Sequence, residues 1–203
     1  MNAISRREFS ILLASAAVFA NTPAWAQGDP AVATVQGFYD ALVAEMKKGG
    51  PAKARYEMLK PAVEKAFDLP GMTAVAVGPG FAALPDADKK ALTDAFERMT
   101  IANYVKNFDS FGGEKFIVEP ASIARPPSPD KLVKSSLKTG TDTIAFNYRM
   151  HQTGSAWKIE DIYLNGNISQ MAQRRSDFSA TFASGGASGL TKKINALADA
   201  QLG

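Results

Sequence analysis

The hydrophobic pattern of this chain changes its period at the glycine pair Gly112-Gly113. Before the pair, apolar residues recur at steps of three and four, which is the spacing of amphipathic helices. After it, from Phe116 to Leu164, they mostly alternate with polar residues, which is typical of strands with one buried face. Beyond Gly166 the helical spacing returns. This order of helices, strands and helices predicts an α+β fold.

The helices are predicted from the apolar spacing and from the residues that end it. Gly49-Gly50-Pro51 stops the first helix, and Pro61 is expected to bend or divide the second. A short apolar segment, 72–77, precedes the longest helix, and Gly185-Gly186 breaks the helix that follows the strands. The first predicted helix begins at Pro30, and the others cover residues 53–67, 86–108, 169–184 and 190–202.

The strand region contains four apolar stretches joined by short turns, 116–123, 132–137, 143–150 and 157–164. Short connections favour antiparallel neighbours. We therefore expect a curved antiparallel sheet of about four strands, with the helices packed on one face. The far face is expected to carry the basic residues Lys134, Lys138, Arg149 and Lys158.

The first 26 residues have the layout of a cleaved export signal. Arg6-Arg7 is followed by a short apolar run, 11–20, and by the small-residue triplet Ala24-Trp25-Ala26. The run is shorter than the roughly 20 apolar residues that a transmembrane helix needs. The paired arginines with Phe9 match a twin-arginine signal, although an ordinary secretion signal fits the same layout. We expect cleavage after Ala26, which leaves residues 27–203 as a single domain.

The composition excludes several classes of site. The chain has no cysteine, so disulfides, thiol nucleophiles and thiolate metal sites are not possible. The formal net charge is +3, and it falls to +2 without the signal because Arg6, Arg7 and Glu8 carry a net +1. That balance does not indicate a nucleic-acid-binding protein. With one histidine, a zinc or iron site is not expected either, so we predict neither a metal nor a cofactor.

The sequence shows no set of catalytic residues. His151 stands at the end of a strand beside a turn, and as a general base it would need a partner and a pocket. Glu160 and Asp161 are neighbours on a strand, so their side chains point to opposite faces. Asp161 shares a face with apolar residues, where a carboxylate needs a hydrogen-bonding partner. We therefore predict no catalytic residue and no enzymatic activity.

Short motifs follow one another in a specific order between Val32 and Leu197. They include Phe38-Tyr39-Asp40-Ala41-Leu42, Phe67-Asp68-Leu69, Val77-Gly78-Pro79, Ala102-Asn103-Tyr104, Gly113-Glu114-Lys115-Phe116, Trp157-Lys158-Ile159-Glu160-Asp161-Ile162-Tyr163 and Arg174-Arg175-Ser176-Asp177-Phe178. In this order and spacing the sequence resembles the MlaC/toluene-tolerance family of periplasmic lipid carriers. The stretch Ser176-Asp177-Phe178 makes it similar to the HpnM-like branch of that family, which is associated with hopanoid synthesis.

The resemblance implies a periplasmic carrier that holds phospholipid or hopanoid in an apolar cavity between the sheet and the helices. It also implies exchange of this lipid with an inner-membrane transport complex of the ABC type and with an outer-membrane partner. Composition alone does not separate such a cavity from an ordinary filled core, so the cavity rests on the resemblance. Because the acyl chains would carry the binding, we expect low selectivity for the headgroup.

The residues expected to line the cavity are large apolar side chains of the long helix, of the short apolar segment with the loop after it, and of the strands. They are Phe96, Met99, Tyr104, Phe108, Val75, Val77, Phe81, Phe146, Tyr148, Trp157 and Ile159. Two alternatives remain open. An isomerase-like or dehydratase-like enzyme would need His151 or Asp161 inside the cavity. An envelope adaptor that only bridges other proteins would have a filled core and hold no lipid.

Overall fold

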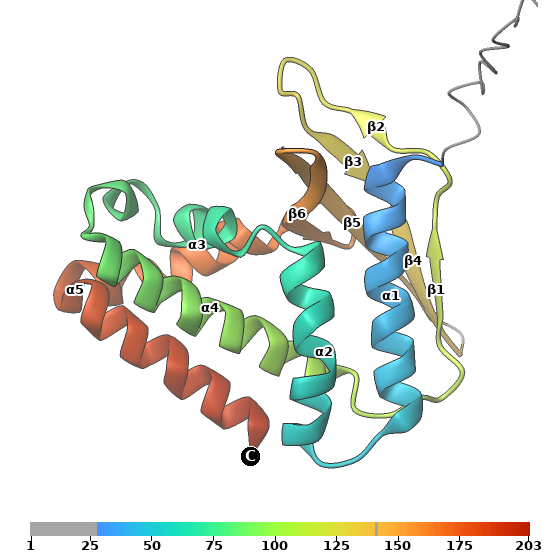
Figure 1. The fold of residues 1–203 in the computed structure, drawn as a ribbon, viewed down its shortest axis with the longest axis horizontal. Coiled ribbons are helices and arrows are strands. Elements are labelled where there is room, and N and C mark those ends of the chain that lie inside the picture. The colour runs from blue at the N-terminus through green and yellow to red at the C-terminus, as the bar shows by residue number, and fades with distance from the viewer. Residues whose placement is uncertain (1–27, 141) are drawn as a thin grey trace, which may run out of the picture.

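The computed structural model describes residues 28–140 and 142–203, so the predicted signal lies outside the described residues. The helices are α1 (Pro30–Lys48), α2 (Ala52–Ala66), α3 (Leu69–Val77), the 3₁₀ helix η2 (Pro79–Ala83), α4 (Asp86–Asn107) and α5 (Gln170–Leu202). The strands are β1 (Lys115–Val118), β2 (Ile123–Ala124), β3 (Lys131–Val133), β4 (Ser135–Thr139), β5 (Asp142–Thr153), β6 (Ala156–Leu164) and β7 (Ile168–Ser169). Helices, strands and a final helix follow in the predicted order (Figure 1).

The strands form four antiparallel rows, with β7 as a two-residue addition to the edge of β6. β3 and β4 are two parts of one row, because both pair with β5 in the same register. Lys131 of β3 pairs with Met150, and Ser136 of β4 pairs with Ala145. β1 and β2 pair with the other edge of that row, and β6 pairs with the other edge of β5. The predicted α+β class and the four antiparallel rows are confirmed. The predicted strand 132–137 extends over residues 131–139 in the structure, and it is interrupted at Lys134.

The helix ends follow local signals in the sequence. The carboxylate of Asp29 accepts from the backbone of α1 and that of Asp68 from the backbone of α3, and Ser169 caps α5 in the same way. The segment 72–77 belongs to a regular helix that begins at Leu69, just after the Asp68 cap. Gly186 has φ 60° and ψ −158°, so α5 is broken there as predicted.

Pro61 was expected to bend or divide the second helix, and it does not divide it. α2 continues without a break from Ala52 to Ala66 with Pro61 inside it. A proline in a helix interior removes one backbone hydrogen bond and disfavours the helix. Leu59 and Val63, on either side of the proline, are fully buried. Their packing against the rest of the core holds α2 together despite this cost.

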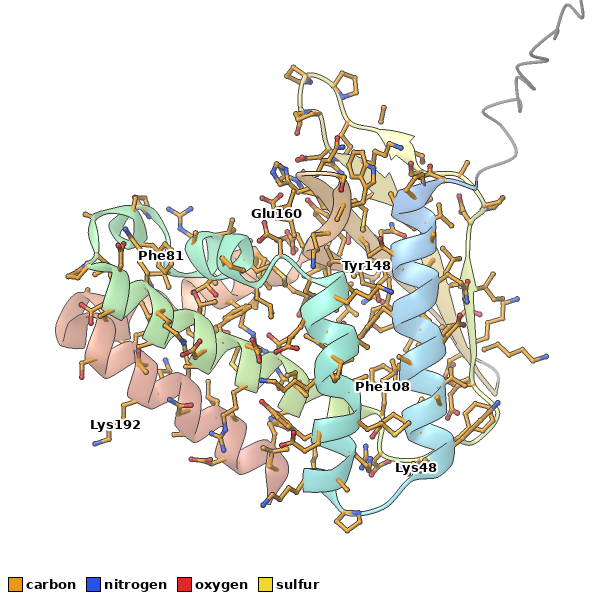
Figure 2. The ribbon with its side chains drawn as sticks, in the orientation of Figure 1. Lys48, Phe81, Phe108, Tyr148, Glu160 and Lys192 are labelled. Carbon is orange, nitrogen blue, oxygen red and sulfur yellow. The ribbon has the colours of Figure 1, made fainter. Side chains whose placement is uncertain are left out.

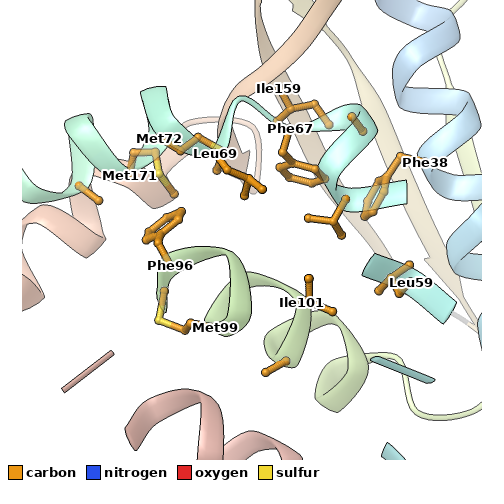
Figure 3. Close-up of a cluster of buried hydrophobic side chains, with 14 of the residues drawn as sticks. Phe38, Leu59, Phe67, Leu69, Met72, Phe96, Met99, Ile101, Ile159 and Met171 are labelled. Carbon is orange, nitrogen blue, oxygen red and sulfur yellow. The ribbon is translucent and has the colours of Figure 1, made fainter. Parts of the chain in front are cut away.

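The helices form a layer on one face of the sheet. Figure 1 shows α1 lying across the strands and α4 running alongside α5. Phe38 and Leu42 of α1 are almost completely buried, as are Met150 and Ile159 of the strands. A second part of the core lies between the helices, where Figure 3 shows Met72, Phe96 and Met171 pointing toward one another from α3, α4 and α5. Helix–sheet and helix–helix packing therefore share one continuous core.

One basic side chain predicted for the far face of the sheet reaches the end of a helix. Lys158 was expected on the far face. It pairs with His151 of β5, and its Nζ donates to the carbonyl oxygens of Glu64 and Lys65 at 3.0 and 2.7 Å. These carbonyls belong to the last turn of α2, where a lysine satisfies acceptors that the helix leaves free. β6 is bulged opposite Arg149 and Met150 of β5, so Asp161, which pairs with Arg149, does not share the face of Ile159 as strand alternation predicted.

An ion pair lies inside the fold, between Glu45 of α1 and Arg55 of α2. The two side chains are 0 % and 7 % exposed, and Arg55 Nε donates to Glu45 Oε1 over 2.5 Å. Arg55 also donates through Nη2 to the carbonyl oxygens of Val105 and Phe108 at the end of α4. Burial raises the pKa of Glu45, and the bonded guanidinium opposes that shift. The pair therefore joins three helices at one buried point.

Candidate functional site

A pocket of about 490 Å³ opens between α4, the start of α5 and the inner face of β5 and β6. We call it the helix–sheet pocket. Its volume is within the range of about 300–1,000 Å³ that is usual for small-molecule sites. Most of its wall is apolar, with a minority of polar side chains. The lining residues are Met72, Phe96, Met99, Thr100, Asn103, Tyr104, Asn107, Phe108, Ile144, Phe146, Ile162, Leu164, Asn165, Gln170, Met171 and Arg174.

The spacing of the lining residues follows from the elements that carry them. On α4 and its C-cap the lining positions run from Phe96 to Phe108 at alternating steps of three and one, which places them along one face of the helix. On β5 the residues are Ile144 and Phe146, two apart, and Leu164 of β6 pairs with Phe146. Alternate strand residues point to the same face, so these side chains all point toward the helices.

Five of the eleven predicted lining residues lie around the helix–sheet pocket, namely Phe96, Met99, Tyr104, Phe108 and Phe146. Phe96 and Met99 are almost fully buried. Tyr104 and Phe108 stack with ring centroids 5.9 Å apart on the wall that α4 contributes. The structure thus brings together the predicted residues of the long helix and one of the strand residues.

Two predicted strand residues lie in the filled core. Tyr148 is 1 % exposed, and its hydroxyl donates to the Tyr39 hydroxyl at 2.8 Å. Tyr39 in turn bonds to Ser135 at 2.8 Å, and burial raises the pKa of Tyr39 to about 12 although both hydrogen bonds oppose the shift. Ile159 is fully buried where β6 meets Phe67. Strand alternation correctly placed Tyr148 and Ile159 on the face of the sheet that the helices cover. At these two residues, however, α1 and α2 fill the space against the sheet.

The other predicted residues lie on or near α3 or in a second hollow. Val77 is buried in α3, whereas Val75 is 40 % exposed on another side of the same helix. Phe81 is in η2, and Figure 2 shows it far along α4 from Phe108. Trp157 lines a hollow of about 540 Å³ between α1, α2 and the β5–β6 turn. None of these four side chains belongs to the lining of the helix–sheet pocket.

The prediction missed eleven residues of the pocket, and only some of them had a usable signal. Ile144 lies two residues from Phe146 on β5, so strand alternation could have found it. Ile162 and Leu164 share this face only because β6 is bulged, which alternation does not predict. Asn103 and Asn107 lie one helical turn apart beside the predicted residues of α4. The contributions of α3 and α5 depend on how these helices pack, which the local sequence pattern does not specify.

A cluster of charged side chains lies outside the pocket, across the neighbouring strands β5 and β6 and the residue that precedes β3. Asp130, His151 and Glu160 offer ligand atoms within 4.8 Å of one another, a spacing that suits a metal ion. Arg149 lies within this cluster, with Nη2 2.5 Å from Asp130 Oδ2 and Nε 3.1 Å from Glu160 Oε2. Since the guanidinium already pairs with both carboxylates, we interpret the cluster as an ion-pair network and not as a metal centre.

The two candidate acid–base residues are both engaged elsewhere. His151 Nδ1 lies 2.9 Å from Asp130 Oδ1, in the ion-pair network. Asp161 accepts from the backbone N–H groups of Ile162 and Met171 at 2.7 and 3.1 Å and from the Ser169 hydroxyl at 2.6 Å. It therefore fixes the start of α5. Neither residue lines the helix–sheet pocket, and Figure 2 shows the neighbouring Glu160 well apart from Phe108.

The ion-pair network predicts a small pH-dependent contribution to stability. The bond to Asp130 raises the pKa of His151, with Glu160 and Asp68 adding to the shift and burial opposing it. Burial raises the pKa of Asp130, but hydrogen bonds from His151, Ser128 and Arg149 outweigh it and lower the pKa to about 2. The contribution of His151 is therefore complete below its unfolded value of 6.5 and lost as the pH rises through its higher folded value.

We expect His151→Gln to lower the unfolding temperature by about 1–2 °C at pH 5.5 and by less at pH 8.5, since pairs this exposed contribute little. The His151 side chain is 40 % exposed. Thermal unfolding of both proteins at the two pH values checks this. An equal difference at both pH values would show that the charge of His151 is not what stabilises the network.

Known proteins resemble this chain in sequence and in fold. A family model described as "MlaC protein" matches residues 34–196 of the chain. The fold is similar to that of the phospholipid-binding protein from Ralstonia solanacearum, solved in complex with a phospholipid, with a TM-score of 0.74 and 19 % sequence identity over 86 % of this chain and 100 % of that chain. A search of the curated proteins gives no match. No helix among residues 28–140 and 142–203 is both long and apolar enough to cross a membrane.

Proposed function

The chain belongs to the MlaC family, and from this we propose that it is a periplasmic lipid carrier. The acyl chains of the bound lipid occupy the helix–sheet pocket. The observation that carries the proposal is the pocket itself, which has an apolar wall of aromatic, aliphatic and methionine side chains between helices and sheet. The similar Ralstonia solanacearum protein was solved with a phospholipid, which supports a lipid as the ligand of the same fold.

The energetics of transfer explain why a carrier needs such a pocket. Each methylene moved from water into an apolar medium is worth about 0.8 kcal/mol, so two acyl chains of ordinary length represent on the order of 20 kcal/mol. A lipid therefore does not cross an aqueous gap by itself. Moving from a bilayer into the pocket exchanges one apolar medium for another, so this transfer is close to balanced. Docking at each membrane then biases the direction, and no chemical step is required.

The proposal places the carrier between two membranes. The predicted export signal supports this location, as does the family. On this proposal the chain exchanges phospholipid or hopanoid with an inner-membrane transport complex of the ABC type and with an outer-membrane partner. The HpnM-like branch, and with it hopanoid as cargo, rests on the motif at Ser176-Asp177-Phe178. We propose no enzymatic activity, because His151 and Asp161 are bonded within other parts of the fold.

Lipid that is retained during purification tests the proposal directly. We expect mass spectrometry of an organic extract of the purified mature protein to show phospholipid or hopanoid in an amount comparable to that of the protein. An unrelated exported protein without a pocket, purified from the same cells, is the control. Repeated recovery of no lipid would contradict a carrier and favour an adaptor that only bridges envelope proteins.

A further inference from the structure

The polar side chains of the helix–sheet pocket come from three places. Asn103 and Asn107 lie one turn apart on α4, Gln170 and Arg174 lie one turn apart on the first part of α5, and Asn165 follows β6. Steps of four place each helical pair on one face of its helix. The polar groups thus come from separate elements, in a pocket whose remaining wall is mostly apolar.

Among the described residues that line the pocket, Arg174 is the only one with a charged side chain. Its side chain is 30 % exposed, and its only ion pair within the described chain is with Asp177, at 4.0 Å and with a carboxylate that is 43 % exposed. A long and exposed contact of this kind is weak. The guanidinium carries five N–H donors, so most of its donor capacity is available to a bound molecule.

The chemistry of these groups matches one part of a lipid. Guanidinium binds a phosphate through two parallel hydrogen bonds, which are stronger than bonds between neutral groups. Asn103 and Gln170 line the same pocket, and their amides are neutral donors. An uncharged lipid would cover Arg174 without providing an anion, and the loss of water around an unpaired charge is unfavourable.

We propose that Arg174 binds the phosphate of the lipid cargo, so that the pocket selects phosphate-bearing lipids over uncharged lipids with the same acyl chains. The inference rests on the proposed function and adds a specificity-determining residue to it. A phosphodiester is common to the glycerophospholipids, so this contact leaves selectivity among their outer headgroups low. It disfavours an uncharged polycyclic lipid as the main cargo.

A competition assay tests the role of Arg174. A fluorescent phospholipid is bound to the delipidated mature protein and displaced by dioleoyl phosphatidylcholine or by dioleoylglycerol, which differ in the phosphocholine group. We expect the wild type to prefer the phosphate-bearing lipid by about tenfold or more, as for one charge-assisted contact. Arg174→Gln should reduce that ratio to about one, and Arg174→Lys should restore part of it because it keeps the charge.

Arg175→Gln is the matched control. The Arg175 side chain packs against Gly78 at the end of α3, since its Nε would lie 3.0 Å from a Cβ atom added to that glycine. Arg175 is not part of the pocket lining. The ratio should be that of the wild type. Inorganic phosphate at millimolar concentration should not displace the probe, and displacement that depends on Arg174 would identify a site for the free anion instead.

The outcomes separate this inference from the proposed function. If the wild type binds both lipids equally, or if Arg174→Gln keeps the preference, then the phosphate is not read by Arg174 while the carrier function stands. If neither lipid nor the fluorescent probe binds any of the folded proteins, the proposed function itself is wrong.

Discussion

Replacing Ile162 with aspartate should lower the affinity for a fluorescent phospholipid by about a hundredfold or more, because the several kcal/mol needed to bury an unpaired carboxylate would oppose binding. Ile162 is only partly buried, and it lines the helix–sheet pocket from β6. In the empty pocket, water can solvate the carboxylate, so folding is affected much less than binding. Equilibrium binding of the probe and mass spectrometry of retained lipid both measure the effect.

Ile117→Asp provides the matched control on the same sheet. Ile117 is 43 % exposed on β1 and does not line the pocket, so this variant should bind like the wild type. Ile144→Trp acts by a different means, since it places a larger side chain in the pocket from β5. It keeps the test valid if the aspartate variant unfolds. Wild-type affinity in both folded pocket variants would show that lipid does not occupy the helix–sheet pocket.

The periodicity of the sequence predicted the layers of this fold well, because burial on one face is a local property of a helix or strand. The alternation from Ile144 to Met150 identified the inner face of β5, and the break at Gly185-Gly186 identified the kink in α5. Pro61 does not divide α2, for a related reason. The cost of a proline is local, but the packing of Leu59 and Val63 that outweighs it comes from the tertiary structure.

The pocket was harder to predict than the layers, because a cavity depends on where packing is left incomplete. Phe146 and Tyr148 share a face of β5, yet Phe146 lines the pocket and Tyr148 is covered, with its hydroxyl bonded to Tyr39. Nothing in their spacing distinguishes the two. Arg174 is likewise an ordinary helix residue in the sequence, and it reaches the pocket only because Asp161 and Ser169 fix the start of α5.

The largest loss of stability is expected from Arg55→Met. The substitution removes the cation beside the fully buried Glu45 and three hydrogen bonds that join α2 to α1 and to the end of α4. Removing one partner of a buried ion pair typically costs about 3–5 kcal/mol. For a chain of this length, that lowers the unfolding temperature by about 10 °C. Calorimetry of the wild type and the variant measures the difference directly.

Two further variants show whether the unpaired charge is the cause. Arg98→Met removes an arginine from the exposed pair with Asp199 and should cost less than about 1 kcal/mol. Glu45→Gln combined with Arg55→Met should recover part of the loss, because no buried charge remains. Burial already raises the pKa of Glu45, and losing Arg55 raises it further. The penalty of the single variant is therefore present above that pKa and shrinks as the pH falls through it. A double variant no more stable than the single one would mean that lost packing around the arginine stem, and not the charge of Glu45, destabilises the protein.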